Sequence, residues 1–257
     1  MYLWAVLHDR PTSWACDVRN WPNDLWPGKL PSQSTMSRRL QTTEVQKVLA
    51  SMEQQVVPLD QGGFVLLIDG KPLKVGSYSK DPDAHWGRDR RGWAKGYKVH
   101  ALYGAESLPR AWDVTSLNVA EPEVAARLVL SQRGGGGYIL GDKIFDSNPL
   151  HEAALAVGCQ LVAQRKRPSS GLGHRRHSLG RLRSIALLQQ EFGQALYAFR
   201  DEIERKFGWF TNHSAGLAPL PNWVRRIHRV RQWIQAKLLI HAVYTHPTSH
   251  PPPLAIA

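Results

Sequence analysis

The chain has little cysteine and no long apolar run. Its 257 residues include only two cysteines, Cys16 and Cys159, too few for a disulfide framework or a zinc-binding set. No apolar stretch approaches the ~20 residues that span a bilayer. Residues 1–7 lack the basic start and the length of a secretory signal. We therefore expect a protein of the reducing cytoplasm without a membrane partner.

Acidic side chains are missing from much of the second half of the chain. None lies between Glu152 and Glu191, and none follows Glu204. Residues 153–257 consequently carry 15 Lys and Arg against four Asp and Glu, which is nearly all of the formal charge of +12. This excess indicates a polyanionic partner, most often nucleic acid and less often a membrane surface.

Three well-separated carboxylates are candidates for a functional site. The apolar run 64–68 leads into Asp69 and the run 138–141 leads into Asp142, as expected of buried strands that end in a carboxylate. An aspartate that begins a β-turn is the plain alternative. Glu204 lies on a predicted helix. Carboxylates that converge from two strand ends and a helix can bind hard divalent cations.

The remaining patterns predict one α/β domain over residues 62–245. Apolar or alternating runs predict strands at 64–69, 96–103, 109–115, 138–142 and 160–163. Helical patterns occur at 121–130, 149–157, around Glu204 and at 223–240, the last with one packed face and one cationic face. This order predicts a mixed sheet, three antiparallel strands followed by parallel strands, flanked by helices. Residues 246–257 are expected to be a disordered tail.

Residues 1–61 are expected to form an N-terminal segment. Residues 1–31 are rich in Trp and Pro and predict irregular structure, whereas 36–52 has the spacing of one helix with a serine N-cap before it. Arg38 and Arg39 could contact phosphate as part of a DNA-binding appendage. The other interpretation is a cap packed on the main domain.

Asp81, Asp83 and His85 lie close together in the polar stretch 79–88. They could be metal ligands, but Asp-Pro-Asp is ordinary turn chemistry, which favours a loop.

The phrases around the three carboxylates resemble the DDE-class transposases of bacterial insertion sequences. They are Ile-Asp69-Gly-Lys-Pro-Leu, Gly-Asp142-Lys-Ile-Phe-Asp-Ser and Arg-Asp-Glu-Ile-Glu204-Arg-Lys-Phe, joined by Ser-Lys-Asp81-Pro-Asp-Ala and Gly96-Tyr-Lys-Val-His. The resemblance covers about residues 62–245. It implies a ribonuclease-H-like fold in which Asp69, Asp142 and Glu204 hold two Mg²⁺ ions, with Mn²⁺ as an alternative.

The resemblance also implies an activity and partners. It implies a transposase that cleaves DNA at element ends and joins them to target DNA, acting as a homodimer in the bacterial cytoplasm. Two metal ions suit this in-line chemistry at phosphorus. A nuclease with the same site, or an inactive DNA-binding relic, is the alternative function.

The choice of the third carboxylate rests on the family pattern. That pattern is Tyr, two residues, Arg, three residues, Glu, six residues, Lys, and Tyr197, Arg200 and Glu204 match it. Amphipathicity alone does not decide, because Glu202 also flanks the apolar stripe of this helix. Arg200 could position a DNA phosphate or pair with Glu204 at i, i+4. Thr211 stands where the family has Lys, so a phosphate contact is missing there.

A basic loop and one lysine are further candidates for DNA contact. Residues 165–183 carry seven Lys and Arg without an acid, so contact with the DNA backbone would be strongly salt-dependent. A solvated loop is the other interpretation. The expected DNA-binding residues of the loop are Arg165, Lys166, Arg167, Arg175 and Arg176. Lys206 could replace the contact that Thr211 cannot make.

Overall fold

The computed structural model describes residues 1–25, 28–56, 63–89, 92–132, 136–174, 176–212, 216–217 and 219–245. Its helices are α1 (Tyr2–Leu7), α2 (Thr12–Ala15), α3 (Gln33–Arg39), α4 (Thr43–Val56), α5 (Glu121–Leu130), α6 (Asn148–Ala156), α7 (Leu179–Leu187), α8 (Glu191–Ala198), α9 (Glu202–Asn212) and α10 (Ile227–Thr245). Its 3-10 turns are η1 (Val18–Asn20), η2 (Asn23–Leu25), η3 (Lys143–Phe145) and η4 (Phe199–Asp201). The tail predicted at 246–257 lies outside the described residues.

Six strands form one mixed sheet. They are β1 (Val65–Lys74), β2 (His85–Asp89), β3 (Gly92–Tyr103), β4 (Pro109–Ser116), β5 (Gly137–Gly141) and β6 (Cys159–Ala163). β3 pairs antiparallel with β1, β2 and β4, whereas β5 pairs parallel with β1 and β6. The predicted mixed sheet, with an antiparallel part followed by a parallel part and helices around it, is confirmed.

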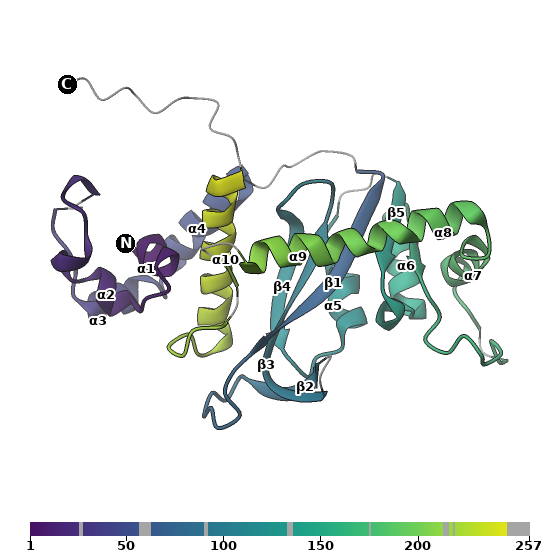
Figure 1. The fold of residues 1–257 in the computed structure, drawn as a ribbon, viewed down its shortest axis with the longest axis horizontal. Coiled ribbons are helices and arrows are strands. Elements are labelled where there is room, and N and C mark those ends of the chain that lie inside the picture. The colour runs from purple at the N-terminus through teal and green to yellow at the C-terminus, as the bar shows by residue number, and fades with distance from the viewer. Residues whose placement is uncertain are drawn as a thin grey trace, which may run out of the picture.

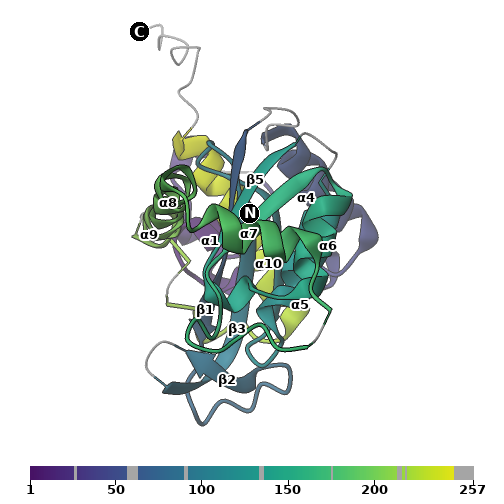
Figure 2. The same cartoon turned by 90° about the vertical axis from the view of Figure 1, so that its right-hand side faces the viewer.

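Helices cover both faces of the sheet, as Figures 1 and 2 show: α8 and α9 cross one face, and α5 and α6 cover the other. Leu67 packs in the core with Ile203 and Phe207 of α9. Its neighbour Ile68 packs on the opposite face with the residues of α5 and α6. Because successive strand residues face opposite sides and both sides are covered, the sequence of β1 reads as a continuous apolar run.

The C-terminal helix α10 is enclosed by other elements. Most of its residues are buried, and it packs against α1, α4 and β4. The prediction of one packed and one cationic face is therefore wrong for most of its length. Lys237 is fully buried, with its ammonium 2.7 Å from the Asp9 carboxylate. Among the described helices, none has both the length and the apolarity needed to cross a bilayer.

The N-terminal segment is more ordered than predicted. Residues 1–31 contain α1 and α2, and the rings of Trp4 and Trp21 stack with centroids 5.3 Å apart. The single helix predicted at 36–52 is two helices, α3 and α4, separated by a turn at 40–42. The predicted serine N-cap is Ser32, whose hydroxyl accepts a hydrogen bond from the N–H of Thr35 at the start of α3. α1 and α4 pack on α10.

Candidate active site

The parallel pairing of β1 with β5 carries Asp69 and Asp142 on neighbouring strands. Leu67 of β1 is the register partner of Leu140 of β5, and each aspartate follows its leucine by two residues. Neighbouring strands lie about 4.8 Å apart. The backbone therefore brings both aspartates to the same level of the sheet, Asp69 within β1 and Asp142 directly after β5.

Asp69 lies on the sheet face that α9 covers. Residues two apart on a strand share a face, so Asp69 shares the face of Leu67. Its cross-strand partner Ala101 belongs to the same core as Leu67. Burial raises the pKa of Tyr103 in this core, and the nearby Asp69 carboxylate raises it further.

Local hydrogen bonds fix one oxygen of each aspartate. Asp69 Oδ1 accepts a hydrogen bond of 2.7 Å from the N–H of Gly70. Asp142 Oδ1 accepts one of 2.7 Å from the N–H of Ile144 and so caps η3. Both aspartates are half-buried. The cap explains why the chain turns immediately after β5.

Glu204 lies on a helical run that crosses the same face. In Figure 1, α8, η4 and α9 follow one another across the front of the sheet. Ile203 and Phe207 of α9 are buried against the sheet, whereas Glu204 is exposed. Phe199 precedes them in η4 and points outward, with 63% of its surface exposed.

Tyr197 and Arg200 lie together beside the end of β5. The Tyr197 hydroxyl donates a hydrogen bond of 3.2 Å to the carbonyl of Gly141, the residue before Asp142. The Arg200 guanidinium lies over the Tyr197 ring, 5.8 Å from its centroid, and pairs with Asp201 at 2.7 Å. Their predicted proximity is present, next to Asp142.

The donor chemistry of this site suits Mg²⁺. Mg²⁺ prefers oxygen ligands and commonly combines one or two carboxylates with water, which the adjacent aspartates can supply. Among the side chains that the structure describes, no group of three or more His, Cys, Asp or Glu is arranged to hold a metal ion. The assignment of Asp69, Asp142 and Glu204 as metal ligands therefore stays a prediction.

Lys206 and Thr211 both lie on α9. The Lys206 ammonium donates hydrogen bonds to the carbonyls of Ala105 at 2.9 Å and Glu106 at 2.8 Å. Burial lowers the pKa of Lys206, which Glu202 and Glu106 partly oppose. Lys206 thus anchors α9 to the connection between β3 and β4, and its DNA contact remains untested.

The basic loop has two parts with different exposure. Arg165 is half-buried and donates to the carbonyls of Pro168 and Ser170 within the loop. Lys166, Arg167 and Arg176 are exposed. Arg175 lies outside the described residues. The last residues of the predicted loop form the start of α7, whose Arg181 points back to Asp146.

Asp146 was not singled out from the sequence, although it holds the basic loop in place. Its carboxylate is almost fully buried and accepts two hydrogen bonds from Arg181, at 2.6 and 2.7 Å. It also accepts one of 3.2 Å from the N–H of Lys166, and His151 Nε2 lies 3.5 Å away. Its position four residues after Asp142 was the only sequence signal.

Asp81 and Asp83 bind the start of α10, as the loop interpretation allows. Asp81 is buried and accepts hydrogen bonds from the Tyr97 hydroxyl at 2.5 Å and from the N–H of Arg226. Asp83 accepts one of 2.9 Å from the N–H of Ile227. His85 is exposed on β2, a strand where the sequence predicted only a loop.

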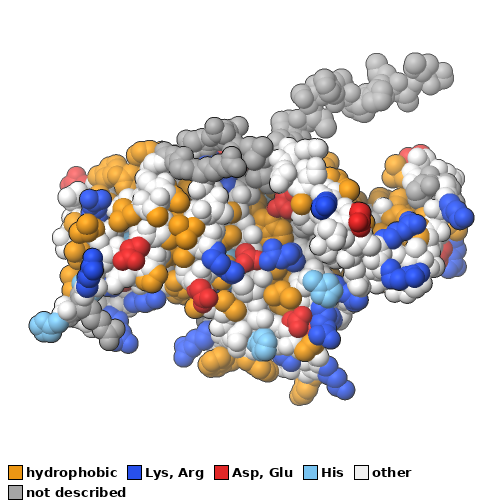
Figure 3. Space-filling view, turned by 180° about the vertical axis from the view of Figure 1, so that it is seen from behind, with side chains coloured by type: hydrophobic (Ala, Val, Ile, Leu, Met, Phe, Trp, Pro, Cys, Tyr) orange, Lys and Arg blue, Asp and Glu red, His pale blue; other side chains and the backbone are white. Residues whose placement is uncertain are grey.

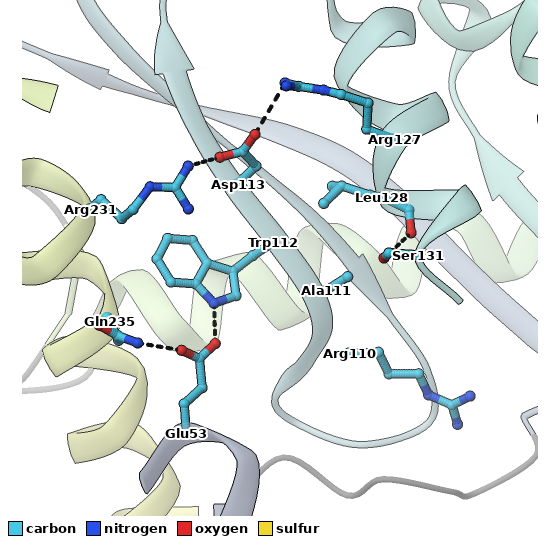
Figure 4. Close-up of a pocket in the computed structure, with 10 residues that line it drawn as sticks. All are labelled: Glu53, Arg110, Ala111, Trp112, Asp113, Arg127, Leu128, Ser131, Arg231 and Gln235. Carbon is cyan, nitrogen blue, oxygen red and sulfur yellow. Dashed lines mark hydrogen bonds and ion pairs between the residues drawn. The ribbon is translucent and has the colours of Figure 1, made fainter. Parts of the chain in front are cut away.

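A cavity of about 470 Å³ lies between β4, α5, α4 and α10 (Figure 4). The Asp113 carboxylate pairs there with Arg127 at 3.1 Å and with Arg231. Glu53 accepts hydrogen bonds from Trp112 and Gln235. These paired groups join α4 and α10 to the sheet.

Two of the solved structures that the chain resembles share little sequence with it. Among solved structures, the chain is similar to a piggyBac transposase synaptic complex with hairpin DNA, with 14% identity and a TM-score of 0.44, covering 84% of this chain and 55% of that chain. It is also similar to a simian T-cell lymphotropic virus intasome in complex with PP2A regulatory subunit B56 gamma, with 13% identity and a TM-score of 0.26, covering 84% and 69%. The chain thus spans about half the length of the piggyBac chain.

The family follows from the sequence itself. The family model described as "Transposase DDE domain" matches residues 61–242, more than half of the chain. The chain belongs to this family. No curated protein matches it significantly.

Proposed function

We propose that this chain is a metal-dependent DNA transposase that cleaves the ends of an insertion-sequence element and joins them to target DNA inside the cell. Its ligands for two Mg²⁺ ions would be Asp69, Asp142 and Glu204, and Mn²⁺ could replace Mg²⁺. The observation that carries the proposal is the parallel register of β1 and β5, which sets both aspartates on adjacent strands of a chain from the transposase DDE domain family.

The chain's own residues would hold and orient the DNA. When bound, two metal ions activate the attacking oxygen and stabilise the leaving oxygen of an in-line displacement at phosphorus. Arg200, stacked on Tyr197 beside Asp142, would contact a phosphate. The exposed Lys166, Arg167 and Arg176 would contact the backbone further along, with Arg165 shaping the loop. A homodimer on DNA would pair the two ends of the element.

The test compares nicking and strand transfer in wild type, Asp142→Asn and Glu204→Gln. The substrate is DNA that carries the sequences flanking the gene, with and without Mg²⁺. Mutation of a residue that only orients a metal ligand lowers metal affinity or activity by about 10–100-fold. Each variant should therefore lose more than about a hundredfold of the nicking and strand-transfer activity. The amide oxygen that Asp142→Asn introduces can still accept the hydrogen bond from Ile144, so the fold should persist.

Glu202→Gln, at a half-exposed acid of the same helical run, is the matched control for this experiment and should retain activity. Full activity of Asp142→Asn would overturn the proposed metal site. Cleavage without joining would instead indicate a nuclease, and metal-independent binding without cleavage an inactive relic.

A further inference from the structure

Strand β2 and the start of β3 form a hairpin with four large side chains on one face. Trp86 is the register partner of Lys95, and Arg88 is the partner of Trp93. Antiparallel partners share a face, as do residues two apart on one strand. Trp86, Arg88, Trp93 and Lys95 therefore lie on the same face, which we call the Trp/Arg face.

The opposite face of the hairpin is packed on the domain. A Cβ atom on Gly87 would lie 2.4 Å from the carbonyl oxygen of Leu117, so the hairpin packs closely on the domain there and leaves no room for a side chain at position 87. The Trp/Arg face consequently points to solvent, with Trp86 49% and Trp93 67% exposed. In Figure 3, hydrophobic side chains and Lys or Arg side chains lie next to one another at the lower edge of the molecule.

The charge of the hairpin favours one kind of partner. The Arg88 guanidinium lies 5.9 Å from the centroid of the Trp93 ring. Asp89, the one acid in the sequence of residues 85–96, is buried and paired with Lys74. Exposed aromatic groups mark interaction sites, and aromatic rings interleaved with cations are the surface that binds unpaired bases of a nucleic-acid strand.

We propose that the Trp/Arg face binds a segment of single-stranded DNA, with bases stacked on Trp86 and Trp93 and a phosphate near Arg88. The Lys95 ammonium is held in place by the Ser79 carbonyl, to which it donates a hydrogen bond of 2.6 Å. The face lies near the end of β1, beyond the proposed metal ligand Asp69. Lys74, whose register partner is Gly96, follows Asp69 by five residues, or about 17 Å of strand. Only this relation to the reacting DNA rests on the proposed function; binding at the face does not.

Equilibrium binding in EDTA tests the proposal without any cleavage chemistry. Three labelled ligands are compared by fluorescence anisotropy: an oligothymidine, an abasic strand of the same length and a duplex. Wild type should bind the oligothymidine more tightly than the abasic strand. Because stacking contributes about 1–3 kcal/mol per base, Trp86→Ala/Trp93→Ala should weaken oligothymidine binding by about tenfold or more and leave the abasic strand and the duplex within about twofold.

Two further variants separate stacking from folding. Trp86→Phe/Trp93→Phe should restore most of the oligothymidine affinity, because Phe also stacks. Trp223→Ala removes an exposed tryptophan elsewhere and should bind as wild type does.

Equal wild-type affinity for the oligothymidine and the abasic strand would overturn the proposal. An equal loss of affinity for all three ligands in Trp86→Ala/Trp93→Ala would also overturn it. Self-association that disappears in Trp86→Ala/Trp93→Ala would assign the face to a second copy of the chain instead. Asp142→Asn should bind as wild type does even if it proves fully active in cleavage.

Discussion

At the scale of single residues, Asp146 is the clearest case of a charge held by its surroundings. Burial alone would raise the pKa of Asp146, but His151, the Arg181 guanidinium and the N–H of Lys166 outweigh it and hold the pKa well below its usual range. A carboxyl whose pKa is lower in the folded state stabilises the fold above its unfolded pKa of about 3.9. That contribution is lost as the pH falls through the folded pKa.

We expect Asp146→Asn to lower the free energy of unfolding by about 3–5 kcal/mol at pH 6, because it leaves Arg181 without its counterion in a mostly buried site. The difference from wild type should shrink as the pH falls from about 4 towards 2, because the unfolded wild type then binds a proton at Asp146 while the folded state keeps this carboxylate charged. Urea unfolding followed at several pH values measures both effects. Asp201→Asn, an exposed acid, is the matched control. A difference that stays constant with pH would show that the charge of Asp146 is not the cause.

At the scale of elements, the start of α10 depends on a loop about 145 residues earlier in the chain. Asp81 accepts from the N–H of Arg226, and Asp83 from the N–H of Ile227, the first residue of the helix. Negative groups stabilise a helix N-terminus by satisfying its free N–H groups and by interacting with its dipole. The burial of Asp81 and its bond to the Tyr97 hydroxyl tie this cap to the sheet.

A double-mutant cycle of Asp81→Ala with Tyr97→Phe tests this connection. Loss of the Asp81 carboxylate leaves the buried Tyr97 hydroxyl without its acceptor, which costs about 1–3 kcal/mol, in addition to about 0.5–2 kcal/mol for the lost cap. In the Tyr97→Phe background the first cost is absent, because the hydroxyl is gone. We therefore expect urea unfolding to give a coupling energy of about 1 kcal/mol or more between Asp81→Ala and Tyr97→Phe. The coupling energy between Asp83→Ala and Tyr97→Phe should be close to zero. Additive effects of Asp81→Ala and Tyr97→Phe would contradict the direct bond.

The elements that could be predicted are those with local patterns. The apolar runs before Asp69 and Asp142 predicted β1 and β5, and the acids in the first turn predicted α5. β2 was missed because its short sequence holds Gly87, Arg88 and Asp89, and only pairing with β3 makes it a strand. The capping of α10 by Asp81 could not be predicted, because it depends on tertiary contact. The three positions of the candidate site stay a prediction from the sequence, whereas the register that aligns Asp69 with Asp142 required the structure.

At the scale of the whole molecule, the N-terminal segment and the sheet share α10 as a common core. Val6 of α1 and Trp233 of α10 pack in the same cluster as Leu73 of β1. The Lys237 ammonium, fully buried, lies 2.7 Å from Asp9 and 5.3 Å from the centroid of the Trp233 ring. Contacts of this kind favour the packed cap over an independent appendage, and they predict that residues 1–56 unfold together with the catalytic domain.

Asp9→Asn tests this prediction, because it removes the counterion of a buried charge. Burial lowers the pKa of Lys237, and Asp9 opposes that shift. A lysine whose pKa is lower in the folded state destabilises the fold while it is charged, and stability recovers as the pH rises from the folded pKa towards about 10.4. Asp9→Asn should therefore lower the free energy of unfolding by about 1–3 kcal/mol at pH 7. The loss is smaller than for a fully buried pair because Asp9 is 46% exposed. The difference from wild type should narrow as the pH rises towards 10. Lys237→Met, which removes the buried charge itself, should lower the free energy of unfolding less than Asp9→Asn does.

Calorimetry should show one unfolding transition that shifts as a whole in these variants. An early separate transition for the N-terminal segment would mean that α10 does not couple this segment to the sheet.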